Sequence, residues 1–182
     1  MEEWIAKVIA AFVRDAERRR KTKSRIRSWL YGRKLRRKAR LAGDVWCGGP
    51  VYVYCDKVEL DEHVCFNGAL LLGRGRIRIG RYFHSGFGLI VMTENHEYEG
   101  VAIPYDETFR VKDVTIGDFV WLGINVTILP GTRIGRGVII QAGSVVHGEI
   151  PDYAIVGGNP AKVFAYRNKE HFEELAAAGV FH

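Results

Sequence analysis

Apolar and polar residues repeat in blocks of six over residues 114–149. Each block has two positions separated by one residue, the second apolar in all six blocks and the first apolar in four of them, and a glycine often follows. The second position is held by Ile116, Leu122, Ile128, Ile134, Ile140 and Val146. Side chains on a strand alternate between two faces, whereas a helix of period 3.6 falls out of phase with six-residue blocks. The pattern therefore predicts a coil of short parallel strands with one continuous core.

Less regular repeats precede this run and are separated from it by an excursion. They place apolar or small residues at Leu60, Phe66, Leu72, Ile79, Ser85 and Val91. The excursion, residues 95–112, has no sixfold repeat and holds acidic and aromatic side chains. It is too long for an inert connection, and long loops on rigid scaffolds are favoured places for function.

Both flanks of the coil carry apolar residues at helical spacing. The front stripe contains Trp4, Ile5, Val8, Ile9, Phe12 and Val13, and a second, weaker stripe contains Ile26, Trp29 and Leu30. Two helices or one broken helix fit these stripes equally well. After the coil, Phe172, Leu175 and Ala176 share one helical face, with Gly179 as a terminator. This second flanking helix is expected to close the open end of the coil.

These elements predict a mainly β chain in three parts. Residues 1–45 form a basic amphipathic helical segment, residues 46–167 the repeat domain with its excursion, and residues 168–182 a C-terminal helix. The 182-residue length and the 47% apolar content suit one soluble domain. No apolar run approaches the roughly 20 residues of a membrane-spanning helix. The N-terminus lacks a secretory layout, so a cytoplasmic location is expected.

The charge is concentrated at the front of the chain. Residues 1–43 hold 15 of the 27 Lys and Arg residues but 4 of the 21 acidic ones. Three interpretations remain open for this segment: docking on an anionic membrane surface, packing on the end of the coil, or binding nucleic acid. Nucleic acid is the least favoured because no recognisable nucleic-acid-binding module accompanies the basic run.

Three features, in order along the chain, carry a resemblance to a known family. The sixfold repeats, the corner Val120–Gly123 and the stretch Val156–Phe164 resemble hexapeptide-repeat O-acetyltransferases, such as those acting on maltose, galactosides and polysaccharides. The resemblance covers about residues 58–167. It implies a left-handed parallel β-helix, roughly four turns at three sides per turn, and a homotrimer with active sites between subunits. Ordinary parallel crossovers are right-handed, so only the resemblance favours the left hand.

The resemblance implies that His96, at the start of the excursion, is the general base. A histidine has an ordinary pKa of about 6.5 and accepts a hydroxyl proton near neutral pH. The repeat register points His96 away from the core. Glu97 and Glu99 are candidates to orient its imidazole, although a solvated acidic loop explains them equally well. Asn95, Glu97 and Tyr105 are expected to contact the acceptor.

The resemblance also assigns residues to the acyl donor, acetyl-CoA. Trp121 is expected to line the donor or acceptor cleft, with packing against a neighbouring subunit as the alternative. Gly123 and Ile124 follow it, and Ile124 replaces a hydroxyl residue found in many relatives, which leaves its amide to stabilise an oxyanion. Small side chains at Ala142 and Gly143 are expected to let coenzyme A run close to the coil. Lys162 is expected to neutralise a phosphate of coenzyme A.

One departure concerns His147-Gly148, where many sugar acetyltransferases carry Thr-Lys. A donor phosphate contact is therefore missing or comes from elsewhere in the chain. A zinc site of the carbonic-anhydrase type is disfavoured because His63, His84 and His96 do not reproduce its close spacing. Cys47, Cys55 and Cys65 form no Cys-x-x-Cys pair, so neither a disulfide framework nor a zinc site is indicated. No metal is expected.

The leading prediction is acetyl transfer from acetyl-CoA to a hydroxyl of a sugar or glycan acceptor. The acceptor itself is not specified by the sequence, and a lipid-linked glycan would suit membrane docking. Two alternatives stay open: N-acylation of an amino sugar, where a neutral amine needs less help from a base, and a binding module that keeps the coil without catalysis.

Overall fold

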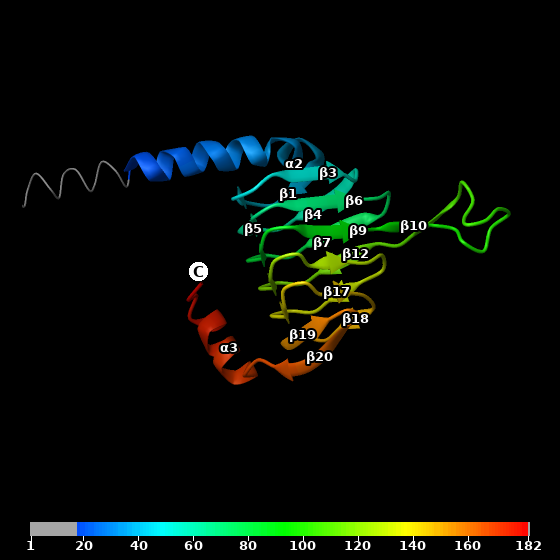
Figure 1. The fold of residues 1–182 in the computed structure, drawn as a ribbon. Coiled ribbons are helices and arrows are strands. Elements are labelled where there is room, and N and C mark those ends of the chain that lie inside the picture. The colour runs from blue at the N-terminus through cyan, green and yellow to red at the C-terminus, as the bar shows by residue number, and fades with distance from the viewer. Residues whose placement is uncertain (1–17, 182) are drawn as a thin grey trace, which may run out of the picture.

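A computed structural model describes residues 18–181, which form a parallel β-helix with three sheets (Figure 1). Sheet A contains β1 (Ala39–Leu41), β4 (Lys57–Leu60), β7 (Arg76–Ile79), β12 (Val114–Ile116), β15 (Arg133–Ile134) and β18 (Glu149–Ile150). Sheet B contains β2 (Val45–Cys47), β5 (Val64–Phe66), β8 (His84–Ser85), β13 (Trp121–Leu122), β16 (Ile139–Ile140), β19 (Ala154–Gly158) and the antiparallel edge strand β20 (Ala161–Tyr166). Sheet C contains β3 (Val51–Tyr54), β6 (Ala69–Leu72), β9 (Leu89–Met92), β14 (Thr127–Ile128) and β17 (Val145–Val146).

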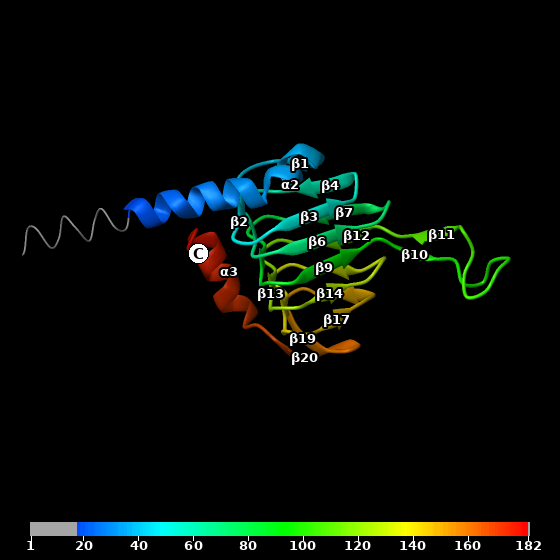
Figure 2. The same cartoon turned by 45° about the horizontal axis from the view of Figure 1, so that its top comes forward.

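The chain visits sheets A, B and C in turn and completes about six turns, where roughly four were expected. The difference arises because the coil already begins at Ala39, inside the segment assigned to the basic helix, and its early corners are irregular in length. The coil is left-handed, as the resemblance implied. In Figures 1 and 2 the nearer strands β3, β6 and β9 run toward the β10 label while the chain descends the axis.

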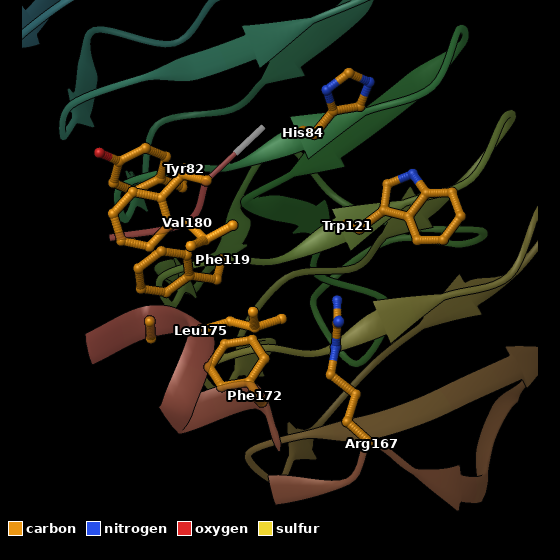
Figure 3. Close-up of a pocket in the computed structure, with 10 residues that line it drawn as sticks. Tyr82, His84, Phe119, Trp121, Arg167, Phe172, Leu175 and Val180 are labelled. Carbon is orange, nitrogen blue, oxygen red and sulfur yellow. The ribbon is translucent and has the colours of Figure 1, made fainter. Parts of the chain in front are cut away.

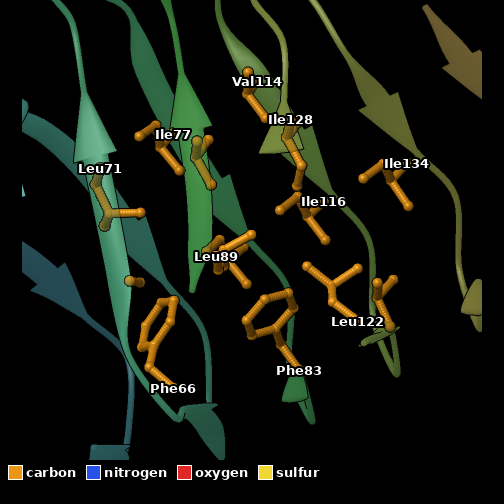
Figure 4. Packing of buried hydrophobic residues seen from close by; sticks show 14 of the residues in the cluster. Phe66, Leu71, Ile77, Phe83, Leu89, Val114, Ile116, Leu122, Ile128 and Ile134 are labelled. Atoms are coloured by element: carbon orange, nitrogen blue, oxygen red, sulfur yellow. The ribbon is translucent and has the colours of Figure 1, made fainter. Parts of the chain in front are cut away.

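The core of the coil is built by the alternation seen in the sequence. In β12, Val114 and Ile116 are buried while Thr115 between them is exposed. Parallel pairing sets Ile79 beside Ile116 and Ile116 beside Ile134, so each apolar slot stacks on the next turn. Figure 4 shows Val114, Ile116 and Ile134 among the side chains that fill the interior. Stacking of this kind buries each short strand, which has no stable core alone.

The corners between sheets A and B carry a column of residues with left-handed backbone conformation. Its members on successive turns are His63, Tyr82, Phe119, Gly137 and Tyr153, and we call it the A–B column. The rings of Tyr82 and Phe119 stack with centroids 5.1 Å apart, and His63 stacks on Tyr82 at 4.7 Å. Only Gly137 lacks a side chain, which leaves a gap in the column.

The C-terminal helix α3 (Lys169–Ala177) lies along the side of the coil and fills that gap. The ring of Phe172 lies 5.8 Å from Phe119 and 5.4 Å from Tyr153, and a Cβ at Gly137 would come within 3.1 Å of it. The helix itself was expected, but its predicted place at the open end of the coil was wrong. Aromatic stacking on the A–B column holds it at the side instead.

The N-terminal end of the coil is covered by α2 (Arg33–Lys38), whose Leu35 is fully buried. The Arg36 guanidinium donates hydrogen bonds to the Ser28 and Val45 carbonyls, and the Ser28 hydroxyl accepts one from the Cys47 amide. These contacts favour the end-packing interpretation for residues 28–38. Residues 18–31 are helical and project away from the coil in Figure 1. The stripe from Trp4 to Val13 lies outside the described residues.

The excursion is a two-stranded arm. β10 (Glu94–His96) pairs antiparallel with β11 (Phe109–Val111), and the arm extends from the coil at the corner between sheets C and A (Figure 2). Val101 and Ile103 near its tip are almost fully exposed, at 97% and 95%. The arm therefore presents apolar side chains that its own coil does not cover.

Candidate active site

The residues predicted to bind the acyl donor converge on the corner between sheets B and C. Gly123 packs directly on Ala142 of the next turn, since a Cβ at Gly123 would lie 2.5 Å from the Ala142 nitrogen. The Gly143 amide donates a hydrogen bond of 2.9 Å to the Ile124 carbonyl. One turn further, Lys162 of β20 pairs with Gly157 of β19. We call this strip of successive turns the donor corner.

The donor corner presents little side-chain bulk and one backbone amide without a hydrogen-bond partner among residues 18–181. Gly143 has no atom within 4 Å of the position that a Cβ would occupy, so a ligand can approach its backbone. Within residues 18–181 the Ile124 N–H has no hydrogen-bond partner, and the Ile124 side chain is 54% exposed. A free backbone amide of this kind can stabilise a developing oxyanion.

Trp121 stands on the outer face of sheet B next to the donor corner. Its indole is 52% exposed, and its strand neighbours are His84 on the preceding turn and Ile139 on the following one. The repeat register that aims Leu122 into the core aims Trp121 outward. The exposed ring offers a flat apolar surface beside the donor corner.

His96 lies at the base of the arm with its ring held on several sides. Its Nδ1 is 3.3 Å from the Asp106 carbonyl oxygen, and its ring stacks on Tyr105 at 4.0 Å and contacts Phe109 at 4.4 Å. His96 and Asn95 line a cavity of about 370 Å³ with Tyr54, Leu72 and Met92 of sheet C. A carbonyl acceptor at Nδ1 favours the tautomer whose Nε2 is free to accept a proton.

The side-chain carboxylates of Glu97 and Asp106 bind other groups of the arm. Glu97 accepts a hydrogen bond of 2.6 Å from the Arg110 Nε, and this bond holds the pKa of Glu97 below its usual range. The Asp106 carboxylate accepts from the Thr108 hydroxyl and from the Thr108 and Val101 amides, which lowers its pKa. The orienting contact of His96 thus comes from a backbone carbonyl, and Glu97 serves the arm.

The two halves of the predicted site lie on different sides of the coil. His96 is at the corner between sheets C and A, whereas Trp121 is on sheet B, opposite that corner. Figure 2 shows β10 and β13 on opposite sides of the coil. A single chain therefore does not bring His96 and the donor corner together.

The chain is similar in sequence and in fold to known acetyltransferases. The family model "Bacterial transferase hexapeptide (six repeats)" matches residues 113–148. The putative lipopolysaccharide biosynthesis O-acetyl transferase WbbJ of Escherichia coli K12 is 34% identical over 126 residues, which cover 68% of this chain and 64% of that relative. The chain thus spans less than two thirds of the length of WbbJ. The maltose O-acetyltransferase structure from Clostridium difficile matches with a TM-score of 0.65 and 26% identity, covering 74% of this chain and 73% of that one.

The chain belongs to the hexapeptide-repeat transferase family. A galactoside acetyltransferase structure in complex with coenzyme A shares the fold, with a TM-score of 0.60 at 22% identity over 73% of this chain and 67% of that one. The resemblance drawn from the repeats, Val120–Gly123 and Val156–Phe164 is therefore confirmed at the level of family and fold.

Sequence analysis of this hexapeptide-repeat chain did not assign three polar residues to the site: Asn67, His84 and Arg167. His84 was considered only as a metal ligand, yet its Nε2 lies 3.2 Å from the Asn67 amide nitrogen on the outer side of sheet B. Arg167 donates through Nε to the Gly137 carbonyl at 2.6 Å, and burial lowers its pKa. The strand position of His84, one turn before Trp121, was readable from the repeat, but Arg167 lies beyond it.

No group of three or more His, Cys, Asp or Glu side chains within residues 18–181 is arranged to hold a metal ion. Over the same described range, no helix is long and apolar enough to cross a membrane.

Proposed function

We propose that the chain transfers an acetyl group from acetyl-CoA to a hydroxyl of a sugar or glycan acceptor. The observation that carries this proposal is the donor corner, where small residues from successive turns lie beside the Ile124 amide and a lysine. Such a strip suits a long, thin cosubstrate that ends in phosphates. The names of the relatives, which include O-acetyltransferases, support the same reaction class.

The proposed reaction is a direct transfer. His96 accepts the proton of the acceptor hydroxyl at Nε2 while the hydroxyl oxygen attacks the thioester carbonyl. The Ile124 N–H stabilises the resulting oxyanion. The C–S bond then breaks, and the proton held by His96 passes to the departing thiolate, which gives coenzyme A and an acetyl ester. Trp121 forms the wall beside the reacting atoms.

We propose that the site is completed in a homotrimer. His96 and the donor corner lie on different sides of one coil, so a second copy must supply one of them. The faces of the coil support such packing. Sheet C directs an apolar row outward, formed by Tyr52, Leu70 and Ile90, next to the arm, whereas sheet A directs charged residues outward. Apolar rows left uncovered are typical of subunit interfaces.

Subunit mixing tests this assembly. We expect His96→Ala and Trp121→Ala chains to be nearly inactive alone and to regain activity when they are co-expressed. Random assembly then combines an intact His96 and an intact Trp121 in roughly a quarter of the sites. Light scattering is expected to give a mass three times the 20.6 kDa of one chain. Activity that is not regained in a confirmed mixed trimer would show that both residues act from one copy.

We propose that the projecting basic helix docks the protein on an anionic membrane surface, at the cytoplasmic side, where a lipid-linked acceptor would be reached. Residues 18–38 contain 12 Lys or Arg residues and no acidic residue. Ile26, Trp29 and Leu30 on the same helix are each more than half exposed. Cations beside exposed apolar side chains match the chemistry of a membrane interface.

Neutralising three exposed cations of this helix, Arg20, Lys23 and Arg27, with glutamine is expected to weaken binding to phosphatidylserine vesicles more than tenfold. Each cation near such a surface contributes about 1 kcal/mol. These three substitutions keep the buried Ser28 and Leu35, which pack at the end of the coil. A truncation of residues 1–40 would remove both. The charge-matched control changes Arg76, Arg78 and Arg133 of sheet A. Equal vesicle sedimentation of both variants and the unchanged protein would rule out docking by the helix.

The reaction class is tested by coenzyme A release with a panel of hydroxyl sugars and amino sugars. Release with hydroxyl acceptors is expected. Release only with amino sugars would replace the proposal by N-acylation. Absence of both release and acetyl-CoA binding would leave a binding module.

A further inference from the structure

A second cavity, of about 490 Å³, opens between α3 and the outer face of sheet B (Figure 3). Its inner side is formed by His84 and Trp121, and its outer wall by residues of α3 and the tail that follows it. Most of this lining is apolar and aromatic: Tyr82, Phe119, Phe172, Leu175, Val180 and Phe181. Its volume is within the range of small-molecule sites.

The outer wall is fixed in position. Phe172 fills the gap at Gly137, and Phe181 packs on Tyr82 with ring centroids 4.3 Å apart. The Glu173 carboxylate accepts a 2.6 Å hydrogen bond from the Tyr153 hydroxyl and pairs with Arg136 at 3.1 Å. A wall held by stacked rings and a polar network keeps the cavity open without a ligand, which is the condition for a pre-formed site.

The position of the cavity relative to Trp121 indicates its role. Trp121 lies on the short strand β13 of sheet B. The A–B column lies at the start of the strands of this sheet, and the donor corner lies at their end. A donor lying along the donor corner therefore leaves the opposite side of the indole, where the cavity is, for the second substrate. This step rests on the proposed function.

Arg167 gives the cavity a cationic group. Its Nε is used by the Gly137 carbonyl, and Figure 3 shows its guanidinium extending toward Trp121. Among residues 18–181 no acidic side chain pairs with Arg167, although it is partly buried and lies 5.3 Å over the Phe172 ring. A half-buried arginine without a carboxylate has free donors in the geometry that a phosphate requires.

We propose that this cavity is the acceptor subsite and that it takes a sugar joined through a phosphate to an apolar chain. The aromatic wall packs on the apolar chain, the guanidinium of Arg167 binds the phosphate, and the sugar hydroxyl lies beside Trp121. A bare sugar uses neither feature, because its hydroxyl groups would meet an apolar wall and leave the arginine unpaired.

Four acceptors built on one sugar separate the contribution of the aromatic wall from that of the Arg167 guanidinium. Each sugar of the release screen is compared as its methyl glycoside, its butyl glycoside, its 1-phosphate and its butyl phosphodiester. Binding of the same four compounds is measured by calorimetry in the presence of coenzyme A, so the answer does not depend on turnover. The butyl phosphodiester is expected to bind and react best, with kcat/KM at least tenfold above the methyl glycoside.

Two variants locate the effect in the cavity. Ala176→Trp fills the cavity from α3 and is expected to abolish the advantage of the butyl group, whereas Ala177→Trp, one residue along on the exposed side, is expected to keep it. Arg167→Gln is expected to lower kcat/KM for the butyl phosphodiester at least tenfold, so that the advantage of the phosphate is lost. The KM for acetyl-CoA is expected to stay unchanged.

The outcomes separate this inference from the proposed function. Equal binding of all four compounds, or an unchanged preference in both Ala176→Trp and Arg167→Gln, would overturn the acceptor subsite while acyl transfer stood. Preferential binding of the butyl phosphodiester without any release of coenzyme A would uphold the subsite and reject the acyl transfer.

Discussion

Replacing His96 with alanine is expected to lower kcat for O-acetyl transfer by about two to four orders of magnitude, the usual contribution of a general base. The hydroxyl of a sugar is a poor nucleophile until its proton is removed, and removal of that proton is the role proposed for His96. The Asp106 carbonyl lies 3.3 Å from Nδ1 and Tyr105 stacks on the ring, which leaves Nε2 as the proton acceptor. The KM for acetyl-CoA is expected to change little, because the donor corner is separate.

The matched control is His171→Ala, which removes an exposed histidine of α3 that does not line the second cavity. Steady-state coenzyme A release with hydroxyl and amino acceptors provides the measurement. Retention of more than a tenth of the O-transfer rate in His96→Ala would reject the general-base mechanism. A large loss with hydroxyl acceptors and a small one with amines would support it, because a neutral amine needs less assistance.

The second large effect concerns stability. Phe83→Ala is expected to lower the free energy of unfolding by about 3–5 kcal/mol. Phe83 is fully buried and immediately precedes β8, and its ring packs on Phe66 of the preceding turn with centroids 5.5 Å apart (Figure 4). Because each turn of a coil is stabilised by its neighbours, the cavity left by the ring weakens two turns together.

Phe87→Ala serves as the control for this substitution. Phe87 lies four residues later in the same turn but is 65% exposed, so its removal is expected to change stability by less than about 0.5 kcal/mol. Denaturant unfolding followed by circular dichroism compares the two variants at one protein concentration, since assembly contributes to apparent stability. A similar midpoint for both variants would contradict the structural description of this core.

The sixfold repeat predicted both the coil and most of the donor corner, because the spacing of the repeats decides which residues stack. Every third repeat returns to the same side of the coil, so the corner that follows Leu122 lies against the corner that follows Ile140, and Gly123 meets Gln141 and Ala142 once the strands stack. The outward direction of Trp121 follows from the same alternation. The irregular early repeats gave no such guidance, and the first strand, Ala39–Leu41, was assigned to the basic helix.

Contacts of the arm and the C-terminal tail could not be read in this way. The partner of His96 is the carbonyl of Asp106, and any residue type offers that atom. The place of α3 depends on Phe172 entering the gap at Gly137, which lies far away in the sequence and outside any shared period. Arg167 reaches the second cavity only because that packing forms.

By itself, the sequence determined the parallel coil, the outward position of Trp121 and the convergence of the predicted donor residues, because a period of six converts sequence spacing directly into stacked positions. The tertiary structure alone decided the number of turns, the place of α3, the orientation of His96 and the existence of the second cavity. Each of these depends on side chains from segments without a common period, and their contacts are set by shape and stacking after the coil has formed.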